Sequence, residues 1–182
     1  LWAEKEVATD YTDYMEIKAE IISGYGVAGA RNEGIRSFLE DAFPELKGWV
    51  LGTINAKIIS PQGINVRKIN TAKMKEIDIP PILYLKHPYK YLHNNEEYLS
   101  GEIWRNLPQE KMKLVPVRFK IDNKVVESDG FLYIPSGSPH PQDGTIELIA
   151  KEKLRENYNV GDDDKIIITV NQWNLPVAGR SV

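Results

Sequence analysis

The chain contains no cysteine, which excludes both a disulfide framework and a thiolate zinc site. It has no apolar run near the roughly 20 residues that a membrane-spanning helix requires. It also has no signal peptide with a basic start and an apolar centre, so we expect a cytoplasmic protein without a membrane partner. Basic residues do not predominate: the formal net charge is -3, which gives no overall basic footprint for nucleic acid.

The remaining composition is that of an ordinary globular protein. The chain has 182 residues, of which 42% are hydrophobic and 27% are charged. This length suits one domain with appendages, or at most two small domains. The chain starts at Leu1 rather than at Met, and we expect a processed or excised piece, with a larger parent polypeptide as one interpretation. Internal repeats and low-complexity segments are absent.

The segment 52–58 has the clearest pattern in the chain, because polar and apolar residues alternate strictly along it. As a strand it directs Ile54, Ala56 and Ile58 to one face and Thr53, Asn55 and Lys57 to the other. The polar face offers a hydroxyl, an amide oxygen and an ammonium group, which suit a phosphate and its magnesium ion. The alternative is a half-solvated antiparallel strand whose polar side faces water.

A strand predicted at 16–22 leads into a glycine-rich segment, 23–31. Its glycines let backbone N–H groups converge on an anion, although the segment lacks the GK[ST] ending of a Walker A loop. Apolar residues at helical spacing then predict an amphipathic helix from about Asn32 to Phe43, and Pro44 marks its end. We interpret the apolar stripe of this helix as core contact.

Residues 64–113 give the weakest pattern, because prolines interrupt short, tyrosine-rich segments. From Leu114 onward the chain is predicted to be β, with a hairpin turning at Asp122-Asn123 and a charged helical turn at 151–158. The three aspartates at 162–164 lack the spacing of a calcium loop, so they predict a solvated turn. The expected strands are 115–121, 125–126, 131–134, 145–149 and 165–170. Together with the earlier elements, they predict a small, mainly β barrel with a few short helices.

Four sequence motifs occur in the order found in one enzyme family. Ser23-Gly24-Tyr25-Gly26 with Gly29 is similar to a glycine loop, "SG-x-G-x-G", and Gly52-Thr53-Ile54-Asn55 is similar to "GTLN". Residues 134–140 are similar to "VP-x-x-T-x-H", and residues 145–162 to "IEIIAP-x-x-LRE" followed by a "DGD" turn. Together these motifs resemble the archaeal CTP-dependent riboflavin kinases over roughly residues 17–170.

The resemblance implies a six-stranded cradle-loop barrel and a kinase that uses CTP and Mg²⁺ to phosphorylate riboflavin, or a similar small alcohol, to FMN. The barrel would occupy residues 16–170, including a variable, insertion-rich part at 60–113. An N-terminal arm or helix would precede it at 1–15, and a tail would follow it at 171–182. The partners would be a nucleotide and a riboflavin-like molecule.

The resemblance also implies roles for the matching residues. Thr53 and Asn55 would hold Mg²⁺, and Glu147 would contact the flavin and take the proton of the attacking hydroxyl. Ser138 would be a second flavin contact. Nucleotide contacts would come from the glycine loop and from the segment 153–156, namely from Gly24, Tyr25, Gly26, Gly29, Lys153, Leu154, Arg155 and Glu156.

The chain departs from the family pattern at two places. Val27-Ala28 replaces the glutamate of the glycine loop, and Trp49-Val50 replaces the proline–aromatic pair before "GTLN". Three functions therefore stay open: a riboflavin kinase, a non-catalytic nucleotide- or flavin-binding regulatory domain of a larger protein, and a nucleic-acid-binding barrel. The acidic balance of the chain argues against the third.

Overall fold

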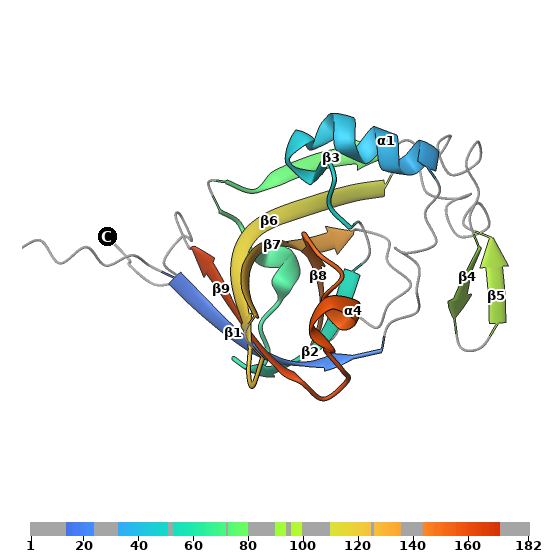
Figure 1. The fold of residues 1–182 in the computed structure, drawn as a ribbon. Coiled ribbons are helices and arrows are strands. Elements are labelled where there is room, and N and C mark those ends of the chain that lie inside the picture. Colours follow the sequence, from blue (N-terminus) through green and yellow to red (C-terminus); the bar gives the residue numbers. More distant parts are fainter. Residues whose placement is uncertain are drawn as a thin grey trace, which may run out of the picture.

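The computed structural model describes residues 14–23, 33–50, 53–71, 73–79, 90–93, 96–99, 110–124, 126–135 and 144–171. Its centre is a closed antiparallel barrel of six strands, with one further strand on its outside (Figure 1). The barrel strands are β1 (Tyr14–Ile22), β2 (Thr53–Ser60), β6 (Glu110–Ile121), β7 (Val126–Pro135), β8 (Thr145–Ala150) and β9 (Lys165–Asn171). The predicted fold class, a mainly β, six-stranded barrel with short helices, is confirmed.

Strand β6 both closes the barrel and carries the outer strand. The barrel order is β6-β7-β8-β2-β1-β9, and β9 pairs back onto β6. The second half of β6 makes this closing contact, from Val117 opposite Val170 to Ile121 opposite Ile166. The first half of β6 instead pairs with β3 (Lys75–Ile79). A second sheet consists of the short hairpin of β4 (Lys90–His93) and β5 (Glu96–Leu99).

The barrel interior follows directly from the period-2 patterns of its strands. Alternate side chains of each strand point inward, as expected for a strand with one buried face. They form one cluster that includes Ile17, Ile21, Ile54, Ala56, Val117, Phe119, Leu132, Leu148, Ile166 and Ile168. The barrel interior is therefore packed with apolar side chains, and polar chemistry must lie on the outer face or at the barrel ends.

A second apolar cluster lies on the outer face of the barrel, under helix α1 (Glu33–Ala42). Leu39 of α1, Phe43 and Leu46 are buried with Met112, Leu114, Tyr133 and Ile149 from β6, β7 and β8. The predicted amphipathic helix and its apolar stripe are thus confirmed as core contact. Pro44 does end the helix, but it also begins a short 3-10 helix, η1 (Pro44–Leu46), which carries the chain toward β2.

The C-terminal hairpin differs from its prediction in one respect. Residues 126 and 131–134, expected to lie in two separate short strands, belong to the single strand β7. Gly130 lies between them and is buried, with Ala150 of β8 opposite. A Cβ atom placed on Gly130 would lie 2.8 Å from the Ile149 carbonyl oxygen. Glycine here permits close approach of two backbones and does not end the strand.

Other boundaries shift by a few residues. β1 begins at Tyr14, inside the predicted N-terminal arm, and β9 extends to Asn171. β6 begins five residues before the predicted strand at 115. The charged helical turn is α4 (Leu154–Tyr158), and a second 3-10 helix, η2 (Val66–Lys68), follows β2. Within the described ranges, no helix is long and apolar enough to cross a membrane.

Candidate functional site

The outer face of β2 carries the predicted magnesium ligands. Ile54 and Ala56 point into the barrel core, which places Thr53, Asn55 and Lys57 on the opposite face, as predicted. This face is only partly exposed to solvent, however. Lys57 is exposed and Thr53 is half-buried, but Asn55 is only 5% exposed. An amide this deeply buried is unusual on the polar side of a strand, so the half-solvated interpretation does not hold at Asn55.

Glu147 of β8 lies directly opposite Asn55 in the strand register. Its side chain is 7% exposed, and it lies on the face opposite Ile146 and Leu148, as predicted. Among the residues that the structure describes, Asn55 and Glu147 are the only polar or charged ones that are buried. Two residues 92 positions apart in sequence are thus brought together by strand pairing. Directly opposed residues have Cβ atoms about 4.5–5.5 Å apart.

Tyr133 of β7 lies opposite Glu147, on the other side of β8 from Asn55. Asn55, Glu147 and Tyr133 therefore occupy one line across β2, β8 and β7 on the outer face, which we call the polar row. Tyr133 is 4% exposed, and its ring packs in the cluster under α1. The sequence patterns did not single out Tyr133. The available signal was the alternation of Tyr133 with Leu132 and Ile134, which point inward and so place Tyr133 on the outer face.

The side-chain oxygen of Asn55 is the unusual atom of this site. Asn55 Oδ1 is buried, and no hydrogen-bond donor reaches it from the residues described here. An unsatisfied buried acceptor costs about 1–3 kcal/mol, so such an atom calls for an explanation such as a ligand or an ion. An amide oxygen next to a carboxylate is a hard donor set of the kind that Mg²⁺ prefers.

The fit of this site to a magnesium ion can be tested on its donors. Thr53, Asn55 and Glu147 together offer a hydroxyl, an amide oxygen and a carboxylate on one face of two paired strands. In the described part of the chain, no three His, Cys, Asp or Glu side chains gather into a metal-binding group. A magnesium ion held here would therefore take its further ligands from water and substrate phosphate, which is how Mg²⁺ commonly binds with nucleotides. The residues present fit that mode.

The polar row lies beside an apolar patch. One step along the strands from Asn55 and Glu147, Thr53 lies opposite Ile149, and Ile149 lies opposite Phe131. The ring of Trp49 packs against that of Phe131, with centroids 5.2 Å apart and planes at 48°. This tilted geometry is a favourable one for an aromatic pair. Trp49, one residue of the Trp49-Val50 pair that stands where the resembled family has proline and an aromatic residue, thus lies near the polar row.

On the other side of β2, the row reaches the end of β1. Ile22 lies opposite Asn55 in the register, and its carbonyl oxygen accepts a hydrogen bond of 3.1 Å from Arg155 Nη2. Arg155 belongs to α4 and to the segment 153–156, which is predicted to contact a nucleotide. Ile22 thus lies beside one predicted metal ligand, Asn55, and contacts one predicted nucleotide residue, Arg155.

The four residues of the segment 153–156 have different surroundings. Leu154 is 3% exposed and belongs to the barrel core, so only its backbone can contact a ligand. Lys153 and Glu156 are exposed and form an ion pair with each other at 3.0 Å. Arg155 forms an ion pair with Asp162 at 2.7 Å. The turn at 162–164, predicted to be merely solvated, is thus partly engaged in specific contacts.

Several predicted site residues lie outside the described residues. These are Gly24, Tyr25, Gly26 and Gly29 of the glycine-rich segment 23–31, and Ser138, which follows β7 in the sequence. Ser23 is the only residue of the glycine motif among the described residues, and Pro135 is the last described residue before Ser138.

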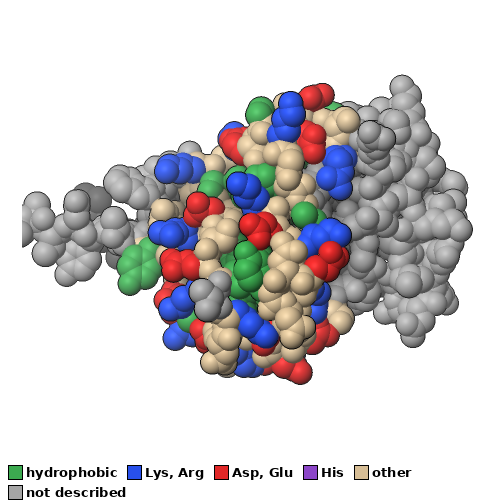
Figure 2. Space-filling view, viewed as in Figure 1, with side chains coloured by type: hydrophobic (Ala, Val, Ile, Leu, Met, Phe, Trp, Pro, Cys, Tyr) green, Lys and Arg blue, Asp and Glu red, His purple; other side chains and the backbone are tan. Residues whose placement is uncertain are grey.

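Charges of both signs are mixed over the face of the barrel in Figure 2. Basic and acidic side chains lie next to each other there, and the coloured residues, which are those that the structure describes, form no stripe of one sign across that face. A surface that binds the phosphate backbone of nucleic acid is instead expected to be basic over a continuous area.

In a comparison of the sequence with models of protein families, no family model matches the chain.

Proposed function

We propose that this protein is a CTP-dependent kinase that phosphorylates riboflavin, or a similar small alcohol, with the help of Mg²⁺. The observation that carries the proposal is the buried Asn55 Oδ1, which has no donor within the described residues and lies beside the buried Glu147. These are two of the residues to which the family resemblance assigns the metal and the proton acceptor. The resemblance itself supplies the identity of the nucleotide and of the acceptor.

Thr53 and Asn55 would hold the magnesium ion. Bound there with the nucleotide, the ion would neutralise charge that develops on the transferred phosphoryl group. The Thr53 hydroxyl and the Asn55 amide are fixed on one strand face, so little reorganisation is needed when the ion binds. Phosphoryl transfer depends mostly on positioning and charge neutralisation, and the rigid wall of the barrel suits that requirement.

Glu147 would act as the proton acceptor for the attacking hydroxyl. Its carboxylate is fixed by β8 opposite Asn55, so a hydroxyl held between them would lie within reach of both groups. A positioned general base contributes typically about 10²–10⁴-fold to a rate. We therefore expect Glu147→Gln to lower kcat by about 100-fold or more, and full turnover by this variant would exclude the role.

The test is an assay of FMN formation from riboflavin with Mg²⁺ and either CTP or ATP. We expect FMN with CTP, little with ATP, and a loss of about 100-fold or more in Thr53→Ala and Asn55→Ala. Thr145→Ala is the matched control, because Thr145 is a half-buried threonine on the same outer face, opposite Lys57. Its activity should stay near that of the unmodified protein.

The outcomes separate the competing functions. CTP binding without FMN formation would replace the kinase with a non-catalytic nucleotide-binding domain. The absence of any binding to CTP or riboflavin by the folded protein would refute the proposal. Binding to DNA or RNA that weakens steeply as salt is raised would favour the nucleic-acid-binding barrel instead.

A further inference from the structure

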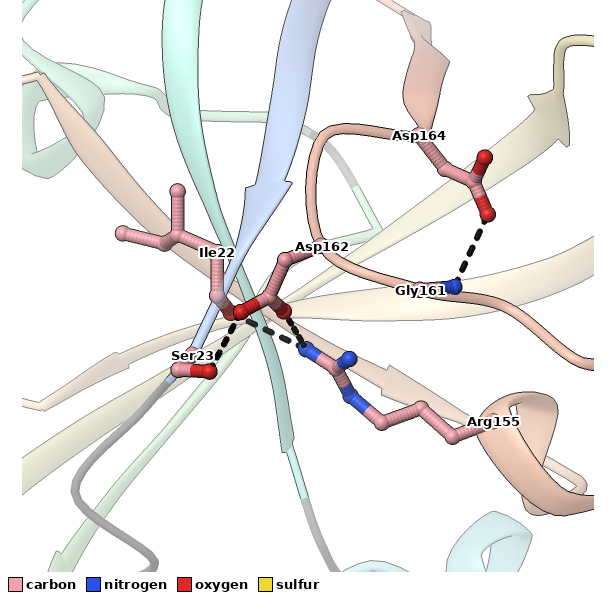
Figure 3. Close-up of polar contacts among 6 residues, drawn as sticks. All are labelled: Ile22, Ser23, Arg155, Gly161, Asp162 and Asp164. Atoms are coloured by element: carbon pink, nitrogen blue, oxygen red, sulfur yellow. Dashed lines mark hydrogen bonds and ion pairs between the residues drawn. The ribbon is translucent and has the colours of Figure 1, made fainter.

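Three segments that are distant in sequence meet at the end of β1, beside the candidate site. They are Ile22 and Ser23 at the end of β1, Arg155 in α4, and Asp162 in the turn before β9 (Figure 3). The Asp162 carboxylate lies between the Ser23 hydroxyl and the Arg155 guanidinium. We call this group of contacts the Asp162 clamp.

Both oxygens of the Asp162 carboxylate are engaged in the clamp. Ser23 Oγ donates to Asp162 Oδ2 at 2.5 Å, and Arg155 Nη2 donates to Asp162 Oδ1 at 2.7 Å. Arg155 Nη2 also donates to the Ile22 carbonyl oxygen at 3.1 Å. The hydrogen bond from Ser23, with the added effect of Arg155, lowers the pKa of Asp162 below its ordinary value of 3.8. The carboxylate is therefore ionised at neutral pH, when its contacts are strongest.

The turn that carries Asp162 is itself well anchored. Asp163 N donates to the Ile21 carbonyl oxygen, and Ile21 N donates to the Asp164 carbonyl oxygen, both at 2.8 Å. The Asp164 side chain accepts a bond of 2.9 Å from Gly161 N (Figure 3). The turn thus continues the pairing of β1 with β9 and delivers the Asp162 carboxylate from a fixed backbone.

The location of the clamp indicates its role. Ser23 is the first residue of the glycine-rich segment 23–31, and Arg155 lies within the segment 153–156; both segments are nucleotide contacts under the proposed function. Ile22 is also the register partner of Asn55, the predicted metal ligand. The clamp therefore fixes Ile22 and Ser23, at the end of β1, against α4 and beside Asn55 of β2.

We infer that Asp162 is a positioning residue that sets the affinity for CTP without touching it; this inference rests on the proposed function. Arg155 Nη2 donates to both Asp162 and Ile22, so the orientation of the Arg155 side chain in the segment 153–156 depends on the clamp. Removal of the clamp releases the end of β1 from α4. Fixing these two elements again when CTP binds costs affinity but leaves the reacting groups on β2 and β8 in place.

The experiment compares Asp162→Asn with Asp163→Asn. Both replace an aspartate by asparagine in the same turn. Asp163 is exposed, has no side-chain hydrogen bond or ion pair to the rest of the described chain, and has a φ of 69° that asparagine tolerates. The dissociation constant for CTP is measured by titration calorimetry with Mg²⁺ at pH 7.5, and kcat and KM by FMN formation.

We expect Asp162→Asn to raise the Kd and the KM for CTP about tenfold, within the usual range for coupling between sites. Its kcat and its KM for riboflavin should change by less than about twofold, and Asp163→Asn should match the unmodified protein. In the Asp162→Asn background, Arg155→Gln should raise the Kd for CTP little further, because the effects of two substitutions in one contact are not additive. If Asp162→Asn does not fold, Ser23→Ala removes one arm of the clamp and should raise the Kd about threefold.

Two results overturn the inference while the proposed function stands. One is unchanged CTP affinity in Asp162→Asn, or in Ser23→Ala where that variant replaces it. The other is an equal loss of affinity in Asp163→Asn, which would show an effect of net charge alone. If the unmodified, folded protein binds no CTP at all, the proposed function and the inference fall together.

Discussion

The substitution Asn55→Leu tests whether the buried amide is retained for function at a cost in stability. Asn55 is 5% exposed, and its Oδ1 accepts no hydrogen bond within the described part of the structure. Leucine has nearly the same shape but no polar atom to leave unsatisfied. Replacement of an unsatisfied buried polar group by an apolar group of the same shape is nearly neutral or stabilising.

The expected effect is a rise in the free energy of unfolding of about 1–2 kcal/mol, from a penalty of about 1–3 kcal/mol for the orphaned oxygen. For a chain of this size, 1 kcal/mol shifts Tm by about 2–4 °C. We therefore expect Asn55→Leu to melt about 2–8 °C higher in the absence of metal and nucleotide. Urea unfolding followed by circular dichroism gives the free energy, and calorimetry gives Tm.

The same experiment with Mg²⁺ and CTP completes the test. A ligand that binds only the folded state raises Tm, so the unmodified protein should gain stability and Asn55→Leu should not. Asn55→Asp is the control that keeps an oxygen donor. It places a second carboxylate opposite Glu147, so it should be less stable without Mg²⁺ and should recover when Mg²⁺ is added. A loss of more than about 1 kcal/mol in Asn55→Leu without metal would show that the amide oxygen is satisfied in solution, and would refute the reasoning.

Three further predictions concern the scaffold. Gly130→Ala should lower the free energy of unfolding by about 1–3 kcal/mol in urea titration, because the new methyl group meets the Ile149 carbonyl oxygen at 2.8 Å. Gly161→Ala is the control, and it should change the free energy of unfolding little because the space around Gly161 is open. Leu39→Ala should cost about 2–5 kcal/mol by the same measurement, since it opens a cavity between α1 and the barrel wall. The hydrogen bond to Glu152 raises the pKa of Tyr158 above 10.0, so this contact stabilises the fold below that pH and is lost as the pH rises through the higher value. Absorbance titration of tyrosinate should show one phenol moving back toward 10.0 in Glu152→Gln.

Much of the barrel could be predicted from local patterns. The alternation at 53–58 placed Ile54 and Asn55 on the correct faces, and the apolar spacing at 35–43 gave helix α1 almost to the residue. These signals are local, because a period of 2 or 3.6 is visible within ten residues. Glu147 was likewise assigned to the correct face of its strand.

Other features depend on strand register, which a single sequence does not contain. Strand β3 has the weakly patterned sequence KEIDI and is a strand because the first half of β6 pairs with it. Tyr133 belongs to the polar row only because β7 pairs with β8 in one register, opposite Glu147. The Asp162 clamp joins Ser23 to a residue 139 positions away, and the three aspartates at 162–164 look equivalent in the sequence. What distinguishes them is the orientation that the turn gives to each.

The size of the barrel explains why its candidate site lies on the outer wall. A barrel of about eight strands has an interior just wide enough to be filled by side chains, and six strands enclose less. The buried inward side chains that the structure describes are apolar, and they leave no buried polar group inside the barrel for a metal or a nucleotide. Polar groups on the outer face would normally be solvated, yet Asn55 and Glu147 are 5% and 7% exposed. A solvated pair would lose much of its electrostatic effect to water, whereas a pair buried against a rigid wall keeps that effect for a charged ligand. The proposed function gives this burial a role, because it assigns the metal ion to Asn55 and the proton of the attacking hydroxyl to Glu147.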